Sequence, residues 1–567
     1  MPDLLPLKFL LVLSALALLP PLARCVPVEV VPVTALHGMV VAAHPQAAAI
    51  GVEVLKRGGN AIDAGVAVSL AVGVAEPYGS GLGGKFMLLY REARSGKTVV
   101  IEAMDACGSA LDVAAYLKLP KTARSQGYSS VCVPGLAAGL WAAHQKWGAK
   151  KWADNIAPVI ALAREGFEVL PKTRDQFDEQ DEVLHRGDAE IARLYLPGGA
   201  QPVIGTLLQN ADLAHTMELL AQQGRDGFYR GEVAEKIVAA SQKGGGVLTL
   251  ADFANYQVRV TEPLALDFRG YRMLSAPPPA HGASLFLTVM KVLEADDFGG
   301  GPLRSPAALD RIGRVWRVVE PPARQVIADS PKSRASFERL ISPASIRALR
   351  EASLAPTGKP TVSREDGPFY ESPMAATTQW MVVDAAGNIA CCTQSQSLHF
   401  GAGVVAPGTG VVLNDSMTNF SFDEPRSLNF IAPGRRPRST ISPTLVERQG
   451  RPVFAIGVPG SSRIPTAMLQ VLLDRLALNR PLVEAIGDTR FHFARMTAAG
   501  APEAFESERS LPAETTQGLR ERGWNIGQTE EAGRGRRFGG VNAIEFNADG
   551  TLTGLADPRR TNAAAGY

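Results

Sequence analysis

The sequence predicts an α+β protein in which helices dominate the first part of the chain and strands the last part. Before residue 355, several segments carry apolar residues at helical spacing. From residue 377 onward, short apolar or β-branched runs are separated by glycine-containing turns, which is typical of strands. Between these parts, residues 355–376 contain four prolines and follow neither period. We therefore expect an exposed loop there.

The composition is typical of a soluble globular protein of the size of an enzyme, and it does not indicate a substrate. The chain has 567 residues, 46% of them hydrophobic, which is enough for a sizeable core. Charged residues make up 20% and leave a formal net charge of +2. No run of like charges indicates a nucleic-acid or acidic partner.

The N-terminus has the layout of a secretory signal peptide. Lys8 precedes a short apolar stretch that Pro20-Pro21 interrupts, and small residues at 23 and 25 flank a possible cut before Val26. This predicts a signal peptide over residues 1–25 and an exported protein, periplasmic or secreted. An uncleaved membrane anchor is the alternative, although the stretch is short for a bilayer.

The first helices have clear start and stop signals. A helix after residue 44 is expected to close at Gly58-Gly59, since glycine accepts the left-handed conformation. Asn60 is expected to cap a second, very apolar and therefore buried helix over residues 61–75. The glycine-rich segment at 79–85 then runs into a strand. It lacks a phosphate-loop pattern, so we expect tight backbone packing there.

Two later segments bear on chemistry. Strands on either side of Gly387-Asn388 predict a hairpin. The segment PGSSRI (459–464) predicts a strand–turn–helix junction. Backbone N–H groups at a helix start can face a developing oxyanion.

Cysteine and histidine give no metal signal. The chain has five cysteines and eight histidines, with no Cys-x-x-Cys and no HExxH. Adjacent Cys391 and Cys392 should point to opposite faces of a strand, which makes them a poor disulfide. We expect buried structural cysteines, structural His399 and His492, no metal and no cofactor.

Thr377 admits two interpretations. A Thr-Thr pair at a strand start is common and needs no function. Alternatively, cleavage of the Ala376–Thr377 bond would free an α-amine with a reference pKa of about 7.7–8.0. That amine would act as general base for the Thr377 hydroxyl, which is a weak nucleophile without one.

Ten landmarks occur in a fixed order along the chain. They are RGGNAIDAGVA (57–67), GSGLGG (79–84), VPGLAAG (133–139), FYRGEVAEKI (228–237), RGYRMLSAPPP (269–279), TT…VVDAAGN (377–388), FGAG (400–403), SPT (442–444), PGSSRI (459–464) and DPRR…GY (557–567). This series resembles the γ-glutamyltransferase (glutathione hydrolase) family of N-terminal nucleophile hydrolases, over nearly all of the mature length.

The resemblance implies a four-layer αββα sandwich made as a precursor. Self-cleavage would separate a large segment, 26–376, from a small one, 377–567, which remain intertwined as one domain. Thr377 matches the family's nucleophile, and Ser395 matches a threonine that supports it. Gly460 and Ser461 match the paired glycines of the family's oxyanion hole, and serine keeps the required N–H.

The resemblance also assigns substrate-binding positions, and several depart from the family. Ser439 and Thr440 match a serine pair that binds the glutamyl α-carboxylate, but Met104 replaces the arginine that clamps it. Three further positions match residues that hold the α-amino group, and none is charged here: Ser397, Ser416 and Asn419. Breaking one side of a buried charged pair costs about 2–5 kcal/mol, so recognition looks rebuilt.

Two more departures lie close to these positions. Lys85 is inserted into the family's glycine run, and Gln379 replaces a histidine that follows the Thr pair. A solvated surface position is the expected one for Lys85 on burial statistics. The alternative is a compensating positive charge.

Three functions remain open. The first is a self-processing γ-glutamyltransferase or glutathione hydrolase that uses a threonyl ester, with water or an amine as acceptor. The second is a related acylase acting on another small-molecule amide. The third is an exported, uncleaved paralogue that binds a ligand without catalysis.

Overall fold

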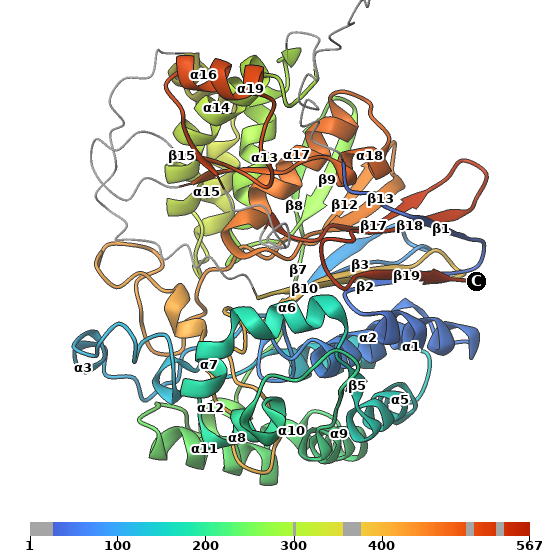
Figure 1. Ribbon diagram of the computed structural model, residues 1–567, viewed down its shortest axis with the longest axis vertical. Helices are drawn as coiled ribbons and strands as arrows, with labels where there is room; N and C mark the ends of the chain where they lie inside the picture. Colours follow the sequence, from blue (N-terminus) through green and yellow to red (C-terminus); the bar gives the residue numbers. More distant parts are fainter. Residues whose placement is uncertain (1–26, 299–301, 355–375, 495–503, 529–537) are drawn as a thin grey trace, which may run out of the picture.

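The computed structural model describes residues 27–298, 302–354, 376–494, 504–528 and 538–567. At its centre two seven-stranded sheets lie face to face, with helices on both outer sides (Figure 1). The predicted α+β class and αββα arrangement are confirmed. The signal peptide predicted at 1–25 lies outside the described residues, as does nearly all of the predicted loop at 355–376.

Both sheets are antiparallel throughout. The first has the spatial order β1 (Pro32–Ala35), β18 (Leu552–Ala556), β17 (Asn542–Phe546), β13 (Arg451–Gly457), β12 (Thr444–Arg448), β9 (Tyr271–Ser275) and β8 (Leu264–Phe268). The second has the order β19 (Ala563–Gly566), β2 (Met39–Ala42), β10 (Thr378–Val383), β11 (Ile389–Ser395), β3 (Lys85–Arg91), β4 (Thr98–Ala103) and β7 (Arg259–Thr261). Each sheet therefore combines strands from before and after residue 376.

The lower helical layer in Figure 1 covers the second sheet. Its helices are α1 (Pro45–Lys56), α2 (Ala61–Ala75), α4 (Leu136–Trp147), α5 (Trp152–Glu165), α6 (Pro171–Glu179), α7 (Asp181–Arg186), α8 (Ala189–Tyr195), α9 (Ala211–Gln223), α10 (Asp226–Tyr229), α11 (Glu232–Lys243) and α12 (Leu250–Ala254). The short helix α3 (Val113–Leu117) projects to one side.

The upper layer covers the first sheet. It contains α13 (Gly282–Leu293), α14 (Pro306–Gln325), α15 (Ser333–Leu340), α16 (Pro343–Leu354), α17 (Ile464–Leu476), α18 (Leu482–Gly487) and α19 (Ala513–Glu521). Two small sheets complete the described fold: β14 (Phe491–Ala494) with β15 (Ala504–Ser507) and β16 (Asn525–Gln528), and β5 (Phe167–Glu168) with β6 (Leu207–Leu208).

The predicted helix boundaries after residue 44 are confirmed. Helix α1 ends at Lys56, and Gly58 follows with φ +81°. Asn60 caps α2 in a capping box, in which Asp63 Oδ2 accepts the Asn60 N–H at 2.9 Å. All residues of α2 except Gly73 are buried. An all-apolar helix is stable only in such an enclosed place.

The predicted hairpin is formed by β10 and β11. Gly387 in its turn has φ +80°, and Asp384 Oδ1 accepts the N–H groups of Ala386 and Asn388 at 3.0 and 2.9 Å. Cys391 packs into the layer between the sheets, and Cys392 packs on the helical side. Both are free and buried, as are Cys107 and Cys132, so the structural interpretation is confirmed.

Candidate active site

Strand register brings the candidate residues to one end of the second sheet. Thr378 pairs with Gln394, Ser395 with Lys85, and Phe86 with Ala103. One position further along the strands, Thr377 is opposite Ser395 and Lys85 is opposite Met104. Thr377, Ser395, Lys85 and Met104 thus lie on neighbouring strands, and side-chain alternation turns all four toward the first sheet.

Thr377 stands directly before β10 with its side chain enclosed. It is 3% exposed, and its Oγ1 donates to Ser395 Oγ at 3.1 Å. Ser395 Oγ also accepts the Ser397 N–H at 3.0 Å. Arg560 Nη1 donates to the Thr377 carbonyl oxygen at 3.0 Å, which fixes the backbone on the side away from the hydroxyl.

The backbone of Thr377 is strained. Its φ of 145° lies in the region that favours glycine, and Thr377 is β-branched. Such outliers cost on the order of 1–3 kcal/mol and persist only where the surroundings enforce them. Here the hydrogen bonds from Arg560 and to Ser395 hold the residue on both sides.

A buried carboxylic acid lies on the helical side of β10. Thr378 points away from Thr377 and donates to Glu76 Oε2 at 3.2 Å, while Tyr78 Oη donates to Glu76 Oε1 at 3.0 Å. Burial raises the pKa of Glu76 to about 7, even though the positive charge of Arg560 opposes this shift. Glu76 therefore titrates near neutral pH.

The segment 459–464 follows β13, whose last residue packs against β10. Gly457 packs against the side chain of Gln379, and Asn542 Nδ2 donates to the Gln379 carbonyl at 2.9 Å. The chain then turns at Gly460, with φ 155°, and Ser461, with φ 50°, before α17 begins at Ile464. The predicted strand–turn–helix junction is confirmed.

The glycine-rich segment before β3 packs as predicted. A Cβ on Gly83 would lie 2.0 Å from the Val412 carbonyl oxygen, and one on Gly84 would lie 2.4 Å from the Ser395 carbonyl oxygen. Only glycine permits this approach. The segment therefore sets the position of Ser395. Its glycines serve close backbone contacts, as the sequence predicted.

The expectation of a solvated Lys85 is wrong. Lys85 is 1% exposed because it lies at the start of β3 between strand ends and the segment 414–419. Its Nζ contacts Asp105 Oδ2 at 3.3 Å, Ser397 Oγ at 2.5 Å and Ser416 Oγ at 2.6 Å. A cation in the interior requires such partners.

Asp105 completes this cluster. It is fully buried, and burial raises its pKa to about 6 although Lys85 opposes the shift. Ser416 Oγ donates to Asp105 Oδ2 at 2.5 Å, and Asn419 Nδ2 donates to Ser397 Oγ at 2.8 Å. Three of the predicted substrate-binding residues are therefore joined to one another through a lysine.

Asp415 is a second buried acid near Lys85. Burial raises its pKa to about 7, and the N–H of Leu398 and the charge of Lys85 lower it. Its Oδ1 accepts the Leu398 N–H at 2.8 Å. This carboxyl group is thus directed toward backbone.

Ser439 and Thr440 approach from the first sheet. Both are half-buried, and the His281 N–H donates to the Ser439 carbonyl at 2.7 Å. Met104 is fully buried in the same apolar cluster as Ala280 and Ile441, which neighbour this pair. Met104 thus supplies apolar contact in this part of the site.

Sequence reasoning missed three residues of the site: Glu76, Asp105 and Arg560. Asp105 directly follows Met104 in the sequence, and Arg560 belongs to the last landmark, so both stood within segments already singled out. Glu76 ends an apolar helix, where a single carboxylate gives no periodic signal. His399 is buried and contacts Gln180 at 3.1 Å, and His492 contacts Thr466 at 2.9 Å, as expected for structural histidines.

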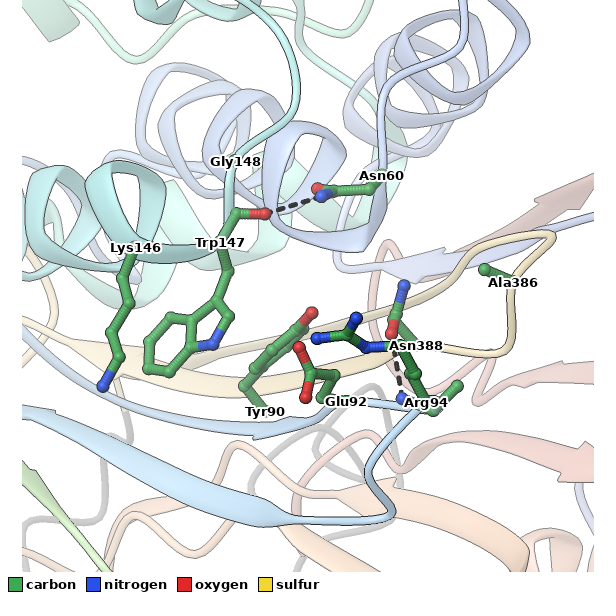
Figure 2. Close-up of a pocket in the computed structure, with 10 residues that line it drawn as sticks. Asn60, Tyr90, Glu92, Arg94, Lys146, Trp147, Gly148, Ala386 and Asn388 are labelled. Carbon is green, nitrogen blue, oxygen red and sulfur yellow. Dashed lines mark hydrogen bonds between the residues drawn. The ribbon is translucent and has the colours of Figure 1, made fainter.

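A separate cavity lies at the other end of the β10–β11 hairpin. Figure 2 shows Tyr90, Trp147, Arg94 and Lys146 around it, with Asn388 at the turn. Its volume is about 540 Å³. Because Thr377 lies at the opposite end of β10, this cavity is not part of the candidate active site.

The described residues contain neither a metal-binding cluster nor a membrane-spanning helix. No group of three or more His, Cys, Asp or Glu side chains there is arranged to hold a metal ion. Across the same residues, the helices are too short or too polar to cross a bilayer.

The fold and the site define an αββα sandwich with a threonine at the head of a central strand. Residues 47–567 match the family model of gamma-glutamyltranspeptidase, and the chain belongs to this family. It is 34% identical over 493 residues to a glutathione hydrolase proenzyme from a Pseudomonas species, a match covering 84% of each chain.

Other relatives carry a different name. The chain is 32% identical over 538 residues to an acylase ACY 1 proenzyme from another Pseudomonas strain, covering 93% of this chain and 92% of the relative. The crystal structure of a cephalosporin acylase from Bacillus halodurans superposes with a TM-score of 0.82 at 25% identity, covering 97% of this chain and 99% of that one.

Proposed function

We propose that the protein cuts itself between Ala376 and Thr377 and then uses Thr377 as the nucleophile of an amide hydrolase and acyltransferase. The observation that carries this proposal is that Thr377 is enclosed and strained and that its hydroxyl donates a hydrogen bond to Ser395. Residues 26–376 and 377–567 would become the large and small chains of one precursor. The proenzyme names of the relatives support this proposal.

Self-cleavage is an acyl shift followed by hydrolysis. Thr377 Oγ1 attacks the carbonyl carbon of Ala376, the C–N bond breaks, and the amine of Thr377 leaves with a proton. Water then hydrolyses the ester, which leaves a carboxylate on Ala376 and restores the hydroxyl. The cut also removes the φ constraint of Thr377, so part of the strain of about 1–3 kcal/mol is released.

Amide cleavage repeats this chemistry on an external donor. The freed amine takes the hydroxyl proton as Oγ1 attacks the donor carbonyl, and the leaving amine departs with a proton. Water or an amine acceptor then resolves the threonyl ester. The N–H groups of Gly460 and Ser461 are proposed to stabilise the oxyanion, where one donor is typically worth roughly 2.7–4 kcal/mol.

The donor is proposed to be a small γ-glutamyl amide or a related acyl amide. The glutathione hydrolase and acylase relatives support both classes. We also propose that residues 1–25 direct export. The uncleaved binding paralogue is the outcome that the experiment below would reveal.

The test compares processing of three variants by denaturing gel and N-terminal sequencing. Wild type and Thr377→Ser are expected to yield a fragment whose first residue is residue 377, and Thr377→Ala to stay whole. Thr378→Ala is the matched control, because it removes the hydroxyl directed at Glu76 and a methyl group but leaves Thr377 unchanged, and it is expected to be cut at the same bond. A Thr377→Ala chain that is still cut there, or a wild type that stays whole, overturns the proposal.

A further inference from the structure

The Lys85 ammonium is a fixed positive charge close to the nucleophile. An ammonium has three donors, and the three nearest oxygens of Lys85 belong to Asp105, Ser397 and Ser416. Lys85 is opposite Ser395 in the sheet, and Ser395 Oγ receives the Thr377 hydroxyl. One residue therefore separates this charge from the reacting hydroxyl across the strands.

The two hydroxyl oxygens around Lys85 already have hydrogen-bond partners. Ser397 Oγ is contacted by Lys85 Nζ and by Asn419 Nδ2, which uses both of its lone pairs. Ser416 Oγ accepts from Lys85 and donates to Asp105. A second ammonium entering here would find these two hydroxyls taken, and the remaining oxygen, Asp105 Oδ1, belongs to the carboxylate that already pairs with Lys85.

The charges of the cluster also disfavour a second ammonium. The Asp105 carboxylate is compensated by Lys85 in a buried ion pair. The second buried acid near Lys85, Asp415, has a pKa raised to about 7 by burial and accepts the Leu398 N–H. A substrate ammonium would meet Lys85 as the cation of this cluster, and like charges at short range in a buried site repel strongly. Ser397 and Asn419 are the half-buried members, so the cluster faces the donor through them.

We propose that Lys85 is a specificity-determining residue that disfavours acyl donors carrying an ammonium beside the acyl chain and favours donors of the same length without it. This inference rests on the function proposed above. It assigns the substrate class as monoamides of dicarboxylic acids, whose remaining end is neutral or anionic.

The test uses two donors that differ only in the α-ammonium: glutaryl p-nitroanilide and γ-glutamyl p-nitroanilide. The wild-type enzyme, with its processing verified, is expected to show the higher kcat/KM on the glutaryl donor. Lys85→Met removes the ammonium, and because Lys85 lowers the pKa of the buried Asp105, Asp105 is expected to be protonated in this variant. The loss of the repelling charge should move the ratio toward the γ-glutamyl donor by about tenfold or more.

Two further variants separate charge from packing. Lys85→Arg keeps the positive charge and should keep the glutaryl preference. Lys85→Met combined with Asp105→Asn also removes the ammonium and should keep most of the shift, because the repelling charge is absent in both variants. If Lys85→Met fails to fold, the wild-type preference and the Lys85→Arg variant still decide the question.

The outcomes distinguish this inference from the proposed function. A processed wild type that prefers the γ-glutamyl donor, or turns over neither donor, overturns the role of Lys85 while self-cleavage stands. An unchanged ratio in processed Lys85→Met overturns it as well. A chain that never releases Thr377 overturns the proposed function and this inference together.

Discussion

At the scale of single residues, the site places side chains in conformations that the sequence pattern does not reveal. Ser461 has φ 50°, a region where an L-residue with a Cβ is strained and glycine is not. The resemblance places a glycine at this position. Ser461 thus keeps an N–H for the turn but adds a conformational cost to it.

Ser461→Gly is expected to stabilise the folded protein by up to about 1 kcal/mol, since relief of strain outweighs the added freedom of the unfolded chain. Ser462→Gly is the control, because Ser462 is not among the positive-φ residues. This variant should lower the free energy of unfolding by about 0.5–1 kcal/mol. Parallel thermal unfolding checks both. Equal losses in the two variants would show that Ser461 is not strained.

Glu76 gives a pH-dependent prediction. Burial raises the pKa of Glu76 from 4.5 to about 7 in the folded protein. Between these two pH values, the folded protein keeps a proton that the unfolded chain releases. Its contribution to stability is therefore fully present below about pH 4.5 and falls as pH rises toward 7. The Glu76→Gln variant has no carboxyl proton to release over this pH range and therefore serves as the reference.

The measurement is the unfolding free energy of wild type minus that of Glu76→Gln at several pH values. This difference should decrease by at most about 3.4 kcal/mol across the window, at 1.36 kcal/mol per pKa unit. A difference that stays constant, or increases with pH, would mean that Glu76 is not a buried acid with a raised pKa.

At the scale of elements, β3 and β11 meet where the glycine segment allows backbone to touch backbone. Gly84 lies against the Ser395 carbonyl, whereas Gly81 lies against the Gln396 side-chain amide, 3.2 Å from the position of an added Cβ. The first contact is between rigid backbone groups. The second involves the end of a side chain that can move.

Gly84→Ala is therefore expected to displace Ser395 and slow self-cleavage, by up to about 100-fold for a shift near 1 Å. Gly81→Ala should be cut at nearly the wild-type rate. The rate at which the fragment starting at residue 377 forms, measured from freshly refolded precursor, checks the pair. Similar rates in both variants would contradict the proposed dependence on the Gly84 contact.

Local signals predicted local structure well. The Asn60 cap, the stop at Gly58, the Gly387 turn and the opposite faces of Cys391 and Cys392 all follow from a few neighbouring residues. Lys85 shows the limit of such reasoning. Its partner Ser397 is 312 residues away in sequence, so only the sheet register brings the two together. Its burial therefore could not be read from composition.

At the scale of the whole molecule, the two segments on either side of residue 376 together build both sheets and the upper helical layer. In the second sheet, β10 and β11 lie between β2 and β3, and β19 lies beside β2. In the first sheet, β1, β9 and β8 flank the strands contributed by the later segment. A cut at residue 376 therefore removes one covalent bond and leaves the sheet pairing unchanged.

This arrangement makes cleavage a way to uncover the Thr377 amine inside a finished fold. The strand that carries it is central, so the new N-terminus stays beside Ser395 and the segment 459–464. The Lys85 cluster at the same sheet end would then act on the donor that binds there. The proposed processing site, nucleophile and specificity residue thus all lie at one end of the second sheet.

The most direct test of this account is the mass of the small fragment during turnover. The processed enzyme would be mixed briefly with an excess of glutaryl p-nitroanilide, quenched in acid and analysed by mass spectrometry with peptide mapping. The account predicts an added acyl group on the peptide that begins at Thr377, absent after a longer incubation. An acyl group on any other residue, or donor hydrolysis without acylation of Thr377, would contradict it.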